Sequence, residues 1–114
     1  MYKKKYGLDN ILYDSNAECA IADWLYLHGI EYIPHKQLPS PSRQRCDFFL
    51  PKHGNKNHGL WVEYDGLINV RELSNCGADI RRDKKYERYQ NLDLDFLVLT
   101  RDNWENDLYI ALMS

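Results

Sequence analysis

Hydrophobic side chains recur at helical spacing near the N-terminus, and this is the clearest pattern in the chain. The apolar positions are Ala17, Ala20, Ile21, Trp24 and Leu25. They fall three or four residues apart, as on one face of a helix. Ser15 suits the N-cap and Gly29 suits the end of the helix. The sequence therefore predicts a helix that begins at Ser15 and stops at Gly29.

Three extended segments follow this helix. IEYIPHKQL (30–38) contains Pro34, which predicts an edge strand because proline cannot donate a sheet hydrogen bond. RCDFFL (45–50) ends at Pro51 and is separated from GLWVEYDG (59–66) by a polar loop rich in Gly and Asn. The loop predicts that these two strands form an antiparallel hairpin.

The C-terminal half predicts two helices and one strand. ADIRRDKKYERYQN (78–91) reads as a helix, and LDFLVLT (94–100) is a nearly continuous apolar run. Such a run is typical of a central strand that is covered on both faces. Residues 103–112 carry apolar side chains at a spacing of four and predict a short closing helix. Residues 67–77 show no clear pattern.

The order of these elements is α-β-β-β-α-β-α, which predicts an α/β fold in a single domain spanning residues 1–114. A three-strand meander leads through a helix to the last strand, which can pair parallel with a central strand. We expect a central mixed sheet flanked by helices, with an extra helix at the C-terminus. A chain of 114 residues can bury one core without metal or disulfide support.

Composition is that of a soluble globular protein. Hydrophobic residues make up 44% and charged residues 28%, and no apolar run approaches membrane-spanning length. The three cysteines are odd in number and widely spaced, which fits reduced thiols. We therefore expect a cytoplasmic protein, or one in the cytoplasm of a host cell if a phage encodes it, with no membrane partner.

Two carboxylates close the strand WVEYDG (61–66). Because alternate strand residues share a face, one face carries Leu60, Val62 and Tyr64, and the other carries Trp61, Glu63 and Asp65. This pair could be an ordinary solvated face that runs into a Gly turn. It could also be part of a metal site, because Mg²⁺ favours carboxylate oxygens and makes a bound water nucleophilic toward a phosphodiester.

Asp47, in the middle of RCDFFL, strengthens the metal interpretation. A carboxylate at this position is a poor strand former and is costly to bury unpaired. In a hairpin, Asp47 and Glu63 can lie on adjacent strands.

Glu18 has two interpretations. Ser15-x-x-Glu18 is a capping box, in which the glutamate reaches back to the backbone of the cap, and the local sequence favours this role. Glu18 also lies one turn before Ile21 and two turns before Leu25, so it faces partly inward. From there it could approach a metal held by the neighbouring strands.

These residues together resemble the PD-(D/E)XK nuclease superfamily, especially its small Holliday-junction resolvase-like, very-short-patch-repair-like and phage homing endonuclease-like members. The resemblance rests on Glu18 in a first helix, Asp47 in RCDFFLP, Glu63 in WVEYDG and a lysine-bearing helix before LDFLVLT. It runs from about Ser15 to Thr100. It implies a restriction-endonuclease-like αβββαβ core and a metal-dependent DNA endonuclease that uses Mg²⁺ or Mn²⁺.

The resemblance also implies roles for individual residues. Asp47 and Glu63 would be metal ligands, the backbone carbonyl of Tyr64 a further ligand, and Glu18 an accessory carboxylate. The lysine of the family's Glu-x-Lys is replaced by Asp65, which is either a third ligand or the turn residue before a glycine. Cys46 stands where the family has proline.

The missing lysine has to come from elsewhere, because its role is to orient the attacking water and to offset developing negative charge. Lys84 and Lys85 of the following helix are the candidates, and Lys85 lies nearer the face marked by Tyr86 and Tyr89. The alternative is a catalytically degenerate protein that binds nucleic acid or a protein partner without cleaving it.

Basic side chains near the proposed site would contact DNA phosphates. They are Arg43, Arg45, Lys52, Lys56, Arg81 and Arg82. The net charge of −2 permits a nucleic-acid partner without requiring one. Because duplex cleavage or junction resolution needs two cuts, the implied function also suggests a homodimer.

Overall fold

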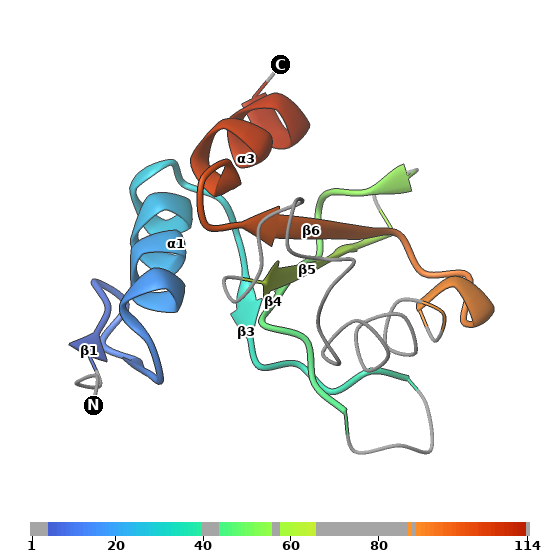
Figure 1. The fold of residues 1–114 in the computed structure, drawn as a ribbon, viewed down its shortest axis with the longest axis horizontal. Coiled ribbons are helices and arrows are strands. Elements are labelled where there is room, and N and C mark those ends of the chain that lie inside the picture. Colours follow the sequence, from blue (N-terminus) through green and yellow to red (C-terminus); the bar gives the residue numbers. More distant parts are fainter. Residues whose placement is uncertain (1–4, 40–43, 56–57, 66–86, 88, 114) are drawn as a thin grey trace, which may run out of the picture.

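The computed structural model describes residues 5–39, 44–55, 58–65, 87 and 89–113 (Figure 1). It is an α/β structure with a four-stranded mixed sheet in the order β3-β4-β5-β6 and a separate two-stranded sheet of β1 and β2. The elements are β1 (Lys5–Tyr6), β2 (Leu12–Tyr13), α1 (Asn16–Leu27), β3 (Ile33–Pro34), β4 (Phe48–Leu50), β5 (Leu60–Asp65), β6 (Phe96–Thr100) and α3 (Trp104–Met113).

The predicted first helix is confirmed as α1. Ser15 is its N-cap, and the Ser15 Oγ accepts a 3.1 Å hydrogen bond from the backbone N–H of Glu18. Gly29 follows the helix with a φ of 69°, a left-handed conformation that glycine adopts without strain. The inward face of α1 is buried through Cys19, Ile21, Ala22, Trp24 and Leu25.

Strand pairing follows most of the sequence predictions. β3 is an edge strand, and its Pro34 lies opposite Phe48 of β4. β4 and β5 are antiparallel neighbours, with Phe48 opposite Val62. β6 runs parallel to β5, with Val98 opposite Glu63. The hairpin, the edge strand and the parallel last strand are therefore confirmed.

Among the described residues, the last strand does not occupy the central position that the sequence predicted. Within the part of the chain that the structure describes, β6 pairs with β5 alone and forms an edge of the sheet. Its apolar sequence reflects coverage of its two faces, because Leu97 and Leu99 belong to one hydrophobic cluster and Phe96 belongs to another. A run of apolar residues indicates that both faces of a strand are covered, but it does not indicate how many strands pair with it.

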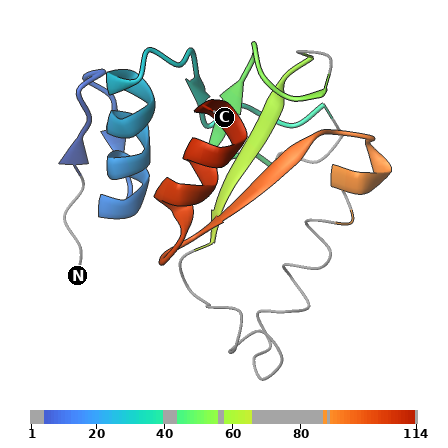
Figure 2. The same cartoon turned by 90° about the horizontal axis from the view of Figure 1, so that it is seen from above.

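The sheet separates two hydrophobic clusters. Figure 2 shows α1 and α3 on one side of the sheet and the short helical turn before β6 on the other. The larger cluster, between the helices and the sheet, includes Tyr13, Ile21, Leu25, Phe48, Leu50, Val62, Leu99 and Leu108. The smaller cluster, on the opposite face, consists of Leu38, Cys46, Trp61 and Tyr89 with Phe49, Leu94 and Phe96 packed against it.

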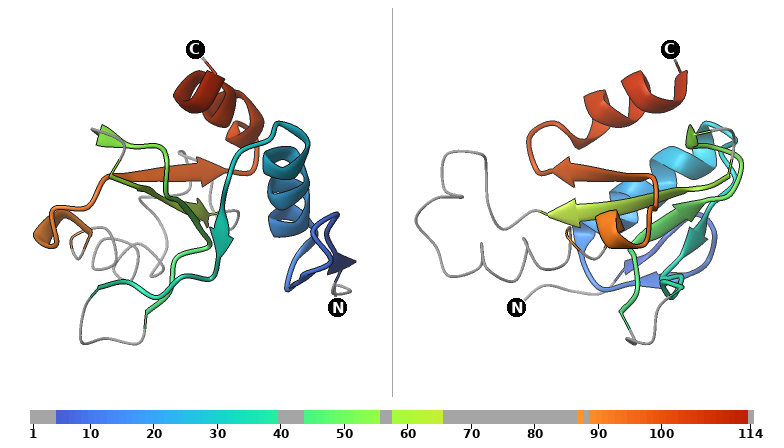
Figure 3. Two further views of the ribbon diagram at one scale, coloured as in Figure 1. Left: turned by 180° about the vertical axis from the view of Figure 1, so that it is seen from behind. Right: turned by 90° about the vertical axis from the view of Figure 1, so that its right-hand side faces the viewer.

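Two further outcomes concern the chain ends. α3 confirms the predicted closing helix, and residues 87 and 89–91 are helical, as expected for the end of the helix over 78–91. The rest of that helix and residues 67–77 lie outside the described residues. The N-terminal hairpin beside α1, seen in both views of Figure 3, was not predicted. In the described ranges, no helix has the length and apolar character needed to cross a membrane.

Candidate functional site

Asp47 lies at a bend immediately before β4, rather than in the middle of a strand as predicted. Its Oδ2 accepts a 2.7 Å hydrogen bond from the backbone N–H of Tyr64, and its carbonyl accepts one of 3.0 Å from the N–H of His35. The Asp47 carboxylate therefore accepts a hydrogen bond from a backbone N–H of β5 at the point where the pairing of β4 with β5 ends.

The same bend changes which face the preceding residue occupies. Strict alternation places Cys46 with Phe48 and Leu50, but Cys46 is buried in the cluster on the opposite face. Burial and the nearby charges of Glu63 and Asp47 raise the pKa of the Cys46 thiol to about 12. Cys46 is therefore a protonated, packed side chain at neutral pH.

Glu63 lies in β5 and is 3% exposed, the one charged side chain that is buried among the described residues. As predicted, it shares a face with Trp61, away from α1. Its Oε1 accepts a 2.6 Å hydrogen bond from the hydroxyl of Tyr89. Burial, the charge of Glu63 and this hydrogen bond all raise the pKa of Tyr89, so its hydroxyl keeps its proton and acts as the donor.

The carboxylate of Glu18 has a buried oxygen and a raised pKa. Ser15 supplies half of the predicted capping box, yet Glu18 Oε2 is buried and has no hydrogen-bond partner among the described residues. Burial, followed by the charges of Asp47 and Asp14, raises the pKa of Glu18 to about 7, against a smaller opposing effect of a backbone hydrogen bond at Asp14. A partly buried carboxylate beside like charges is a position that a bound cation would stabilise.

The charge of Asp47 acts on groups at both faces of the sheet. α1 covers the face of the sheet opposite to the one that Glu63 occupies, and Asp47 lies at the bend between them. Its charge raises the pKa of Glu18 on one side and of Tyr89 on the other. No group of three His, Cys, Asp or Glu side chains in the described residues lies close enough to hold a metal. Mg²⁺ needs only one or two protein carboxylates, because it retains several waters.

Tyr64 and Asp65 occupy the end of β5 next to these carboxylates. The side chain of Tyr64 packs against the larger cluster, while its N–H is taken by Asp47. Asp65 is the last residue of β5 and lies opposite Thr100 of β6, and alternation places it on the same face as Glu63. Asp65 is thus a strand residue, and the glycine after it lies outside the described residues.

The predicted basic residues are mostly outside the described part of the chain. This holds for Arg43, Lys56, Arg81, Arg82, Lys84 and Lys85. Arg45 is exposed and lies in a bridge with Gln37. Lys52 is exposed and its Nζ lies 3.9 Å from Glu31 Oε2, beyond the end of β4 that is opposite to Asp47. Of the described basic candidates, Arg45 is therefore the nearer to Asp47 along the chain.

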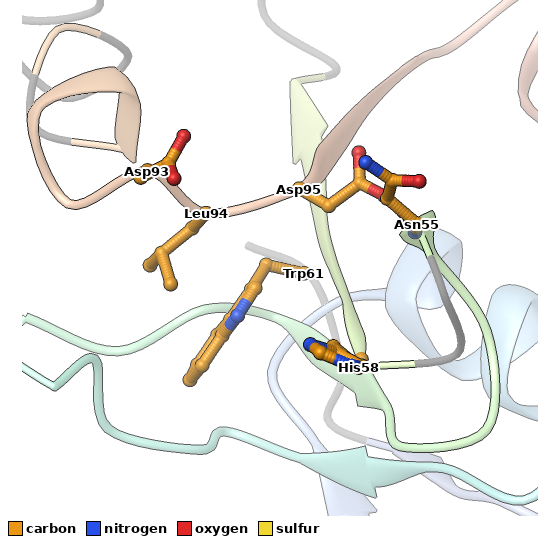
Figure 4. A pocket seen from close by; sticks show the side chains of 7 residues that line it. Asn55, His58, Trp61, Asp93, Leu94 and Asp95 are labelled. Carbon is orange, nitrogen blue, oxygen red and sulfur yellow. Dashed lines mark hydrogen bonds between the residues drawn. The ribbon is translucent and has the colours of Figure 1, made fainter.

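A separate polar pocket of about 360 Å³ lies where β5 and β6 begin. It is lined by Asn55, His58, Gly59, Trp61, Asp93, Leu94 and Asp95 (Figure 4). Asp95 accepts a hydrogen bond from the backbone N–H of Asn55 and so ties the loop before β5 to the start of β6. The pocket contains none of the residues that the sequence predicted for the site.

Compared with known proteins, the chain matches no family model, no curated protein and no solved structure. A function therefore has to be inferred from the residues themselves. The sequence did not predict the contact of Tyr89 with Glu63. Its only signal was the position of Tyr89 on the buried face of the helix before the last strand, which marks burial and names no partner.

Proposed function

We propose that this chain is a metal-dependent DNA endonuclease with a restriction-endonuclease-like core of the PD-(D/E)XK type. The observation that carries the proposal is the buried Oε2 of Glu18, which has no partner in the described ranges and is near enough to Asp47 for that charge to raise the pKa of Glu18. Asp47 in turn is bonded to the backbone N–H of Tyr64, the residue that follows Glu63. The charges of Glu18 and Asp47 repel one another, so their placement is explained by a divalent cation. The mixed sheet, with a hairpin followed by a parallel strand, supports the same core.

The chain offers a donor set of oxygen atoms, which suits Mg²⁺ or Mn²⁺. Asp47 and Glu63 would hold the ion, with the Tyr64 carbonyl as a further ligand and waters completing its shell. Glu18 and Asp65 would be accessory carboxylates, since no three acidic side chains of the described residues form one ligand group. When bound, the ion would lower the pKa of a coordinated water and stabilise charge on the phosphodiester. The hydrogen bonds from Tyr64 and Tyr89 hold the two principal carboxylates in place before any ion arrives.

The remaining parts of the proposal come from the sequence. Lys85, or its neighbour Lys84, would orient the attacking water in place of the missing Glu-x-Lys lysine. Phosphates would be contacted by Arg45 and by the other basic side chains named above. A homodimer would place two sites on a duplex or a four-way junction. The odd number of cysteines supports a reducing, cytoplasmic setting.

A cleavage assay tests the proposal directly. The purified chain is incubated with duplex, four-way-junction and single-stranded DNA in Mg²⁺, in Mn²⁺ and in EDTA. We expect cleavage that requires metal and that is lost in Asp47→Asn and in Glu63→Gln. Glu105→Gln, which removes an exposed carboxylate of α3, is the matched control and should cleave as the wild type does. Cleavage in EDTA, or equal loss in the control, would contradict the proposal.

One observation favours a second candidate, a protein of the same fold that binds nucleic acid or a protein partner without cleaving. Oε1 of Glu63 and Oδ2 of Asp47 already accept hydrogen bonds from the protein, so both carboxylates also have structural roles. This candidate predicts DNA binding that EDTA does not change, and no cleavage with any metal. An electrophoretic mobility shift measured beside the cleavage assay separates the two functions.

A further inference from the structure

Packing and a backbone hydrogen bond hold Tyr89 in position. It is fully buried, and its ring stacks on Phe96 with a centroid distance of 5.1 Å and an interplanar angle of 20°. Cys46 and Trp61 belong to the same cluster, and the Tyr89 carbonyl accepts a 3.1 Å hydrogen bond from the N–H of Leu94. A ring packed in this way leaves its hydroxyl little freedom of position.

The hydroxyl of Tyr89 donates to a carboxylate that is almost fully buried. The 2.6 Å bond from Tyr89 to Glu63 Oε1 joins two buried side chains that are 26 residues apart in the sequence. Hydrogen bonds to an ionised acceptor are short and stronger than those between neutral groups. At 3% exposure, Glu63 depends on protein donors to hold one rotamer.

We propose that Tyr89 is a positioning residue, whose hydroxyl fixes the Glu63 carboxylate in the orientation that binds the metal ion. This inference rests on the proposed function. Carboxylates that bind metals are themselves commonly held by an outer hydrogen-bond partner, whose loss weakens metal binding by about 10- to 100-fold. Tyr89 supplies that partner from the chain segment just before β6, on the face of the sheet opposite to α1.

The test is Mn²⁺ binding, measured on the full chain by the loss of the free-ion electron paramagnetic resonance signal. Tyr89→Phe keeps the packed ring and removes only the donor, and we expect its Kd for Mn²⁺ to rise by about 10- to 100-fold. Tyr13→Phe is the matched control. It removes another buried tyrosine hydroxyl that donates to a carboxylate, Asp9, which is outside the site. The control should leave the Kd unchanged.

A double variant shows whether Tyr89 acts through Glu63. If it does, Tyr89→Phe has no further effect on Mn²⁺ binding once Glu63→Gln is present. Glu63→Asp keeps a carboxylate but retracts it from the hydroxyl, so Tyr89→Phe should likewise have no further effect on Mn²⁺ binding once Glu63→Asp is present. A further loss of affinity in either double variant would show that Tyr89 does not act through Glu63.

Two failures are distinguishable. Wild-type affinity, or tighter binding, in Tyr89→Phe would overturn the role of Tyr89 and leave the metal site standing. A wild-type chain that binds no Mn²⁺, or binding that Asp47→Asn and Glu63→Gln leave unchanged, would overturn the proposed function and this inference with it.

Discussion

The backbone N–H of Tyr64 donates a 2.7 Å hydrogen bond to Asp47 Oδ2 at the place where β4 and β5 cease to pair. The side chain of Asp47 thus substitutes for a main-chain acceptor. This contact gives Asp47 a structural role that is separate from any role as a metal ligand. Substitutions that preserve one role and remove the other should therefore separate stability from activity.

Asp47→Ala and Asp47→Asn should differ in their free energy of unfolding, and both should lose metal-dependent cleavage to a similar degree. Alanine leaves the Tyr64 N–H without its acceptor, which should lower the free energy of unfolding by about 1–3 kcal/mol. Asparagine keeps an oxygen at that position and should cost less than about 1 kcal/mol. Both remove the charge, so both should lower metal-dependent cleavage by at least about 10-fold, the lower end of what loss of a partner at a metal site costs. Urea denaturation and the cleavage assay measure the two effects, and equal destabilisation by the two variants would contradict the structural role.

Glu18→Gln should stabilise the protein at neutral pH when no metal is bound. The pKa of Glu18 is raised from 4.5 to about 7, so the folded state binds its proton more tightly than the unfolded state does. Stability from this group is therefore present below about pH 4.5 and is lost as the pH rises toward 7. Because the side chain is only partly buried, we expect a gain of about 1–2 kcal/mol for the variant above pH 7.

The pH dependence supplies the control for this prediction. Urea denaturation of wild type and Glu18→Gln should give similar stabilities near pH 4 and diverge between pH 5 and 7, the window between the two pKa values. Saturating Mn²⁺ should abolish the advantage of the variant, since a cation stabilises the charged carboxylate. A difference that does not change with pH would show that Glu18 is ionised alike in the folded and unfolded states.

Sequence patterns correctly predicted those features of the fold that depend on neighbouring residues, such as the ends of a helix. Ser15 and Gly29 delimit α1 because capping is decided by neighbouring backbone groups. Pro34 marked an edge strand because it has no donor for a second neighbour. The position of β6 was missed, because a sequence of apolar residues reveals covered faces and carries no information about lateral neighbours.

The sequence predicted which site residues lie on strands and which face they share, but it did not predict their contacts. Alternation placed Glu63 on the face of Trp61, but it could not foresee the bend at Asp47 that moves Cys46 to that face. The contact between Tyr89 and Glu63 joins residues distant in the sequence, and its formation depends on how the chain before β6 packs on the sheet. Such contacts are decided by tertiary packing, which a single sequence does not display.

Gly59→Ala should destabilise the protein more than Gly29→Ala. Gly59 has a φ of 110°, and a Cβ there would lie 2.4 Å from the Phe49 ring, which packs on Trp61 with a centroid distance of 4.5 Å. Gly29 also has a positive φ, of 69°, but a Cβ at Gly29 would meet no atom within 4 Å. Backbone strain alone costs about 1–3 kcal/mol, and Gly59→Ala adds a clash to it. Thermal denaturation of both variants checks the order, and equal losses would contradict it.

Asp9 should anchor the N-terminal hairpin to the rest of the chain. Its Oδ2 accepts hydrogen bonds of 2.5 Å from the hydroxyls of Tyr13 and Tyr32, and its Oδ1 accepts one of 2.9 Å from the N–H of Ile11. Burial raises the pKa of Asp9, but the hydrogen bonds together outweigh burial and hold the pKa below its usual value of 3.8. Asp9→Ala would leave two tyrosine hydroxyls without this acceptor.

We expect Asp9→Ala to lower the free energy of unfolding by about 2–3 kcal/mol at pH 7, because each hydroxyl left unsatisfied carries a desolvation cost. Because the folded pKa is depressed, this contribution is present above pH 3.8 and is lost as the pH falls through the folded pKa. The difference between wild type and variant should therefore shrink in urea denaturation at acid pH. Asp102→Ala, which removes an exposed carboxylate, should change stability by less than about 0.5 kcal/mol. A loss for Asp9→Ala as small as that of Asp102→Ala would show that the hairpin is held by other contacts.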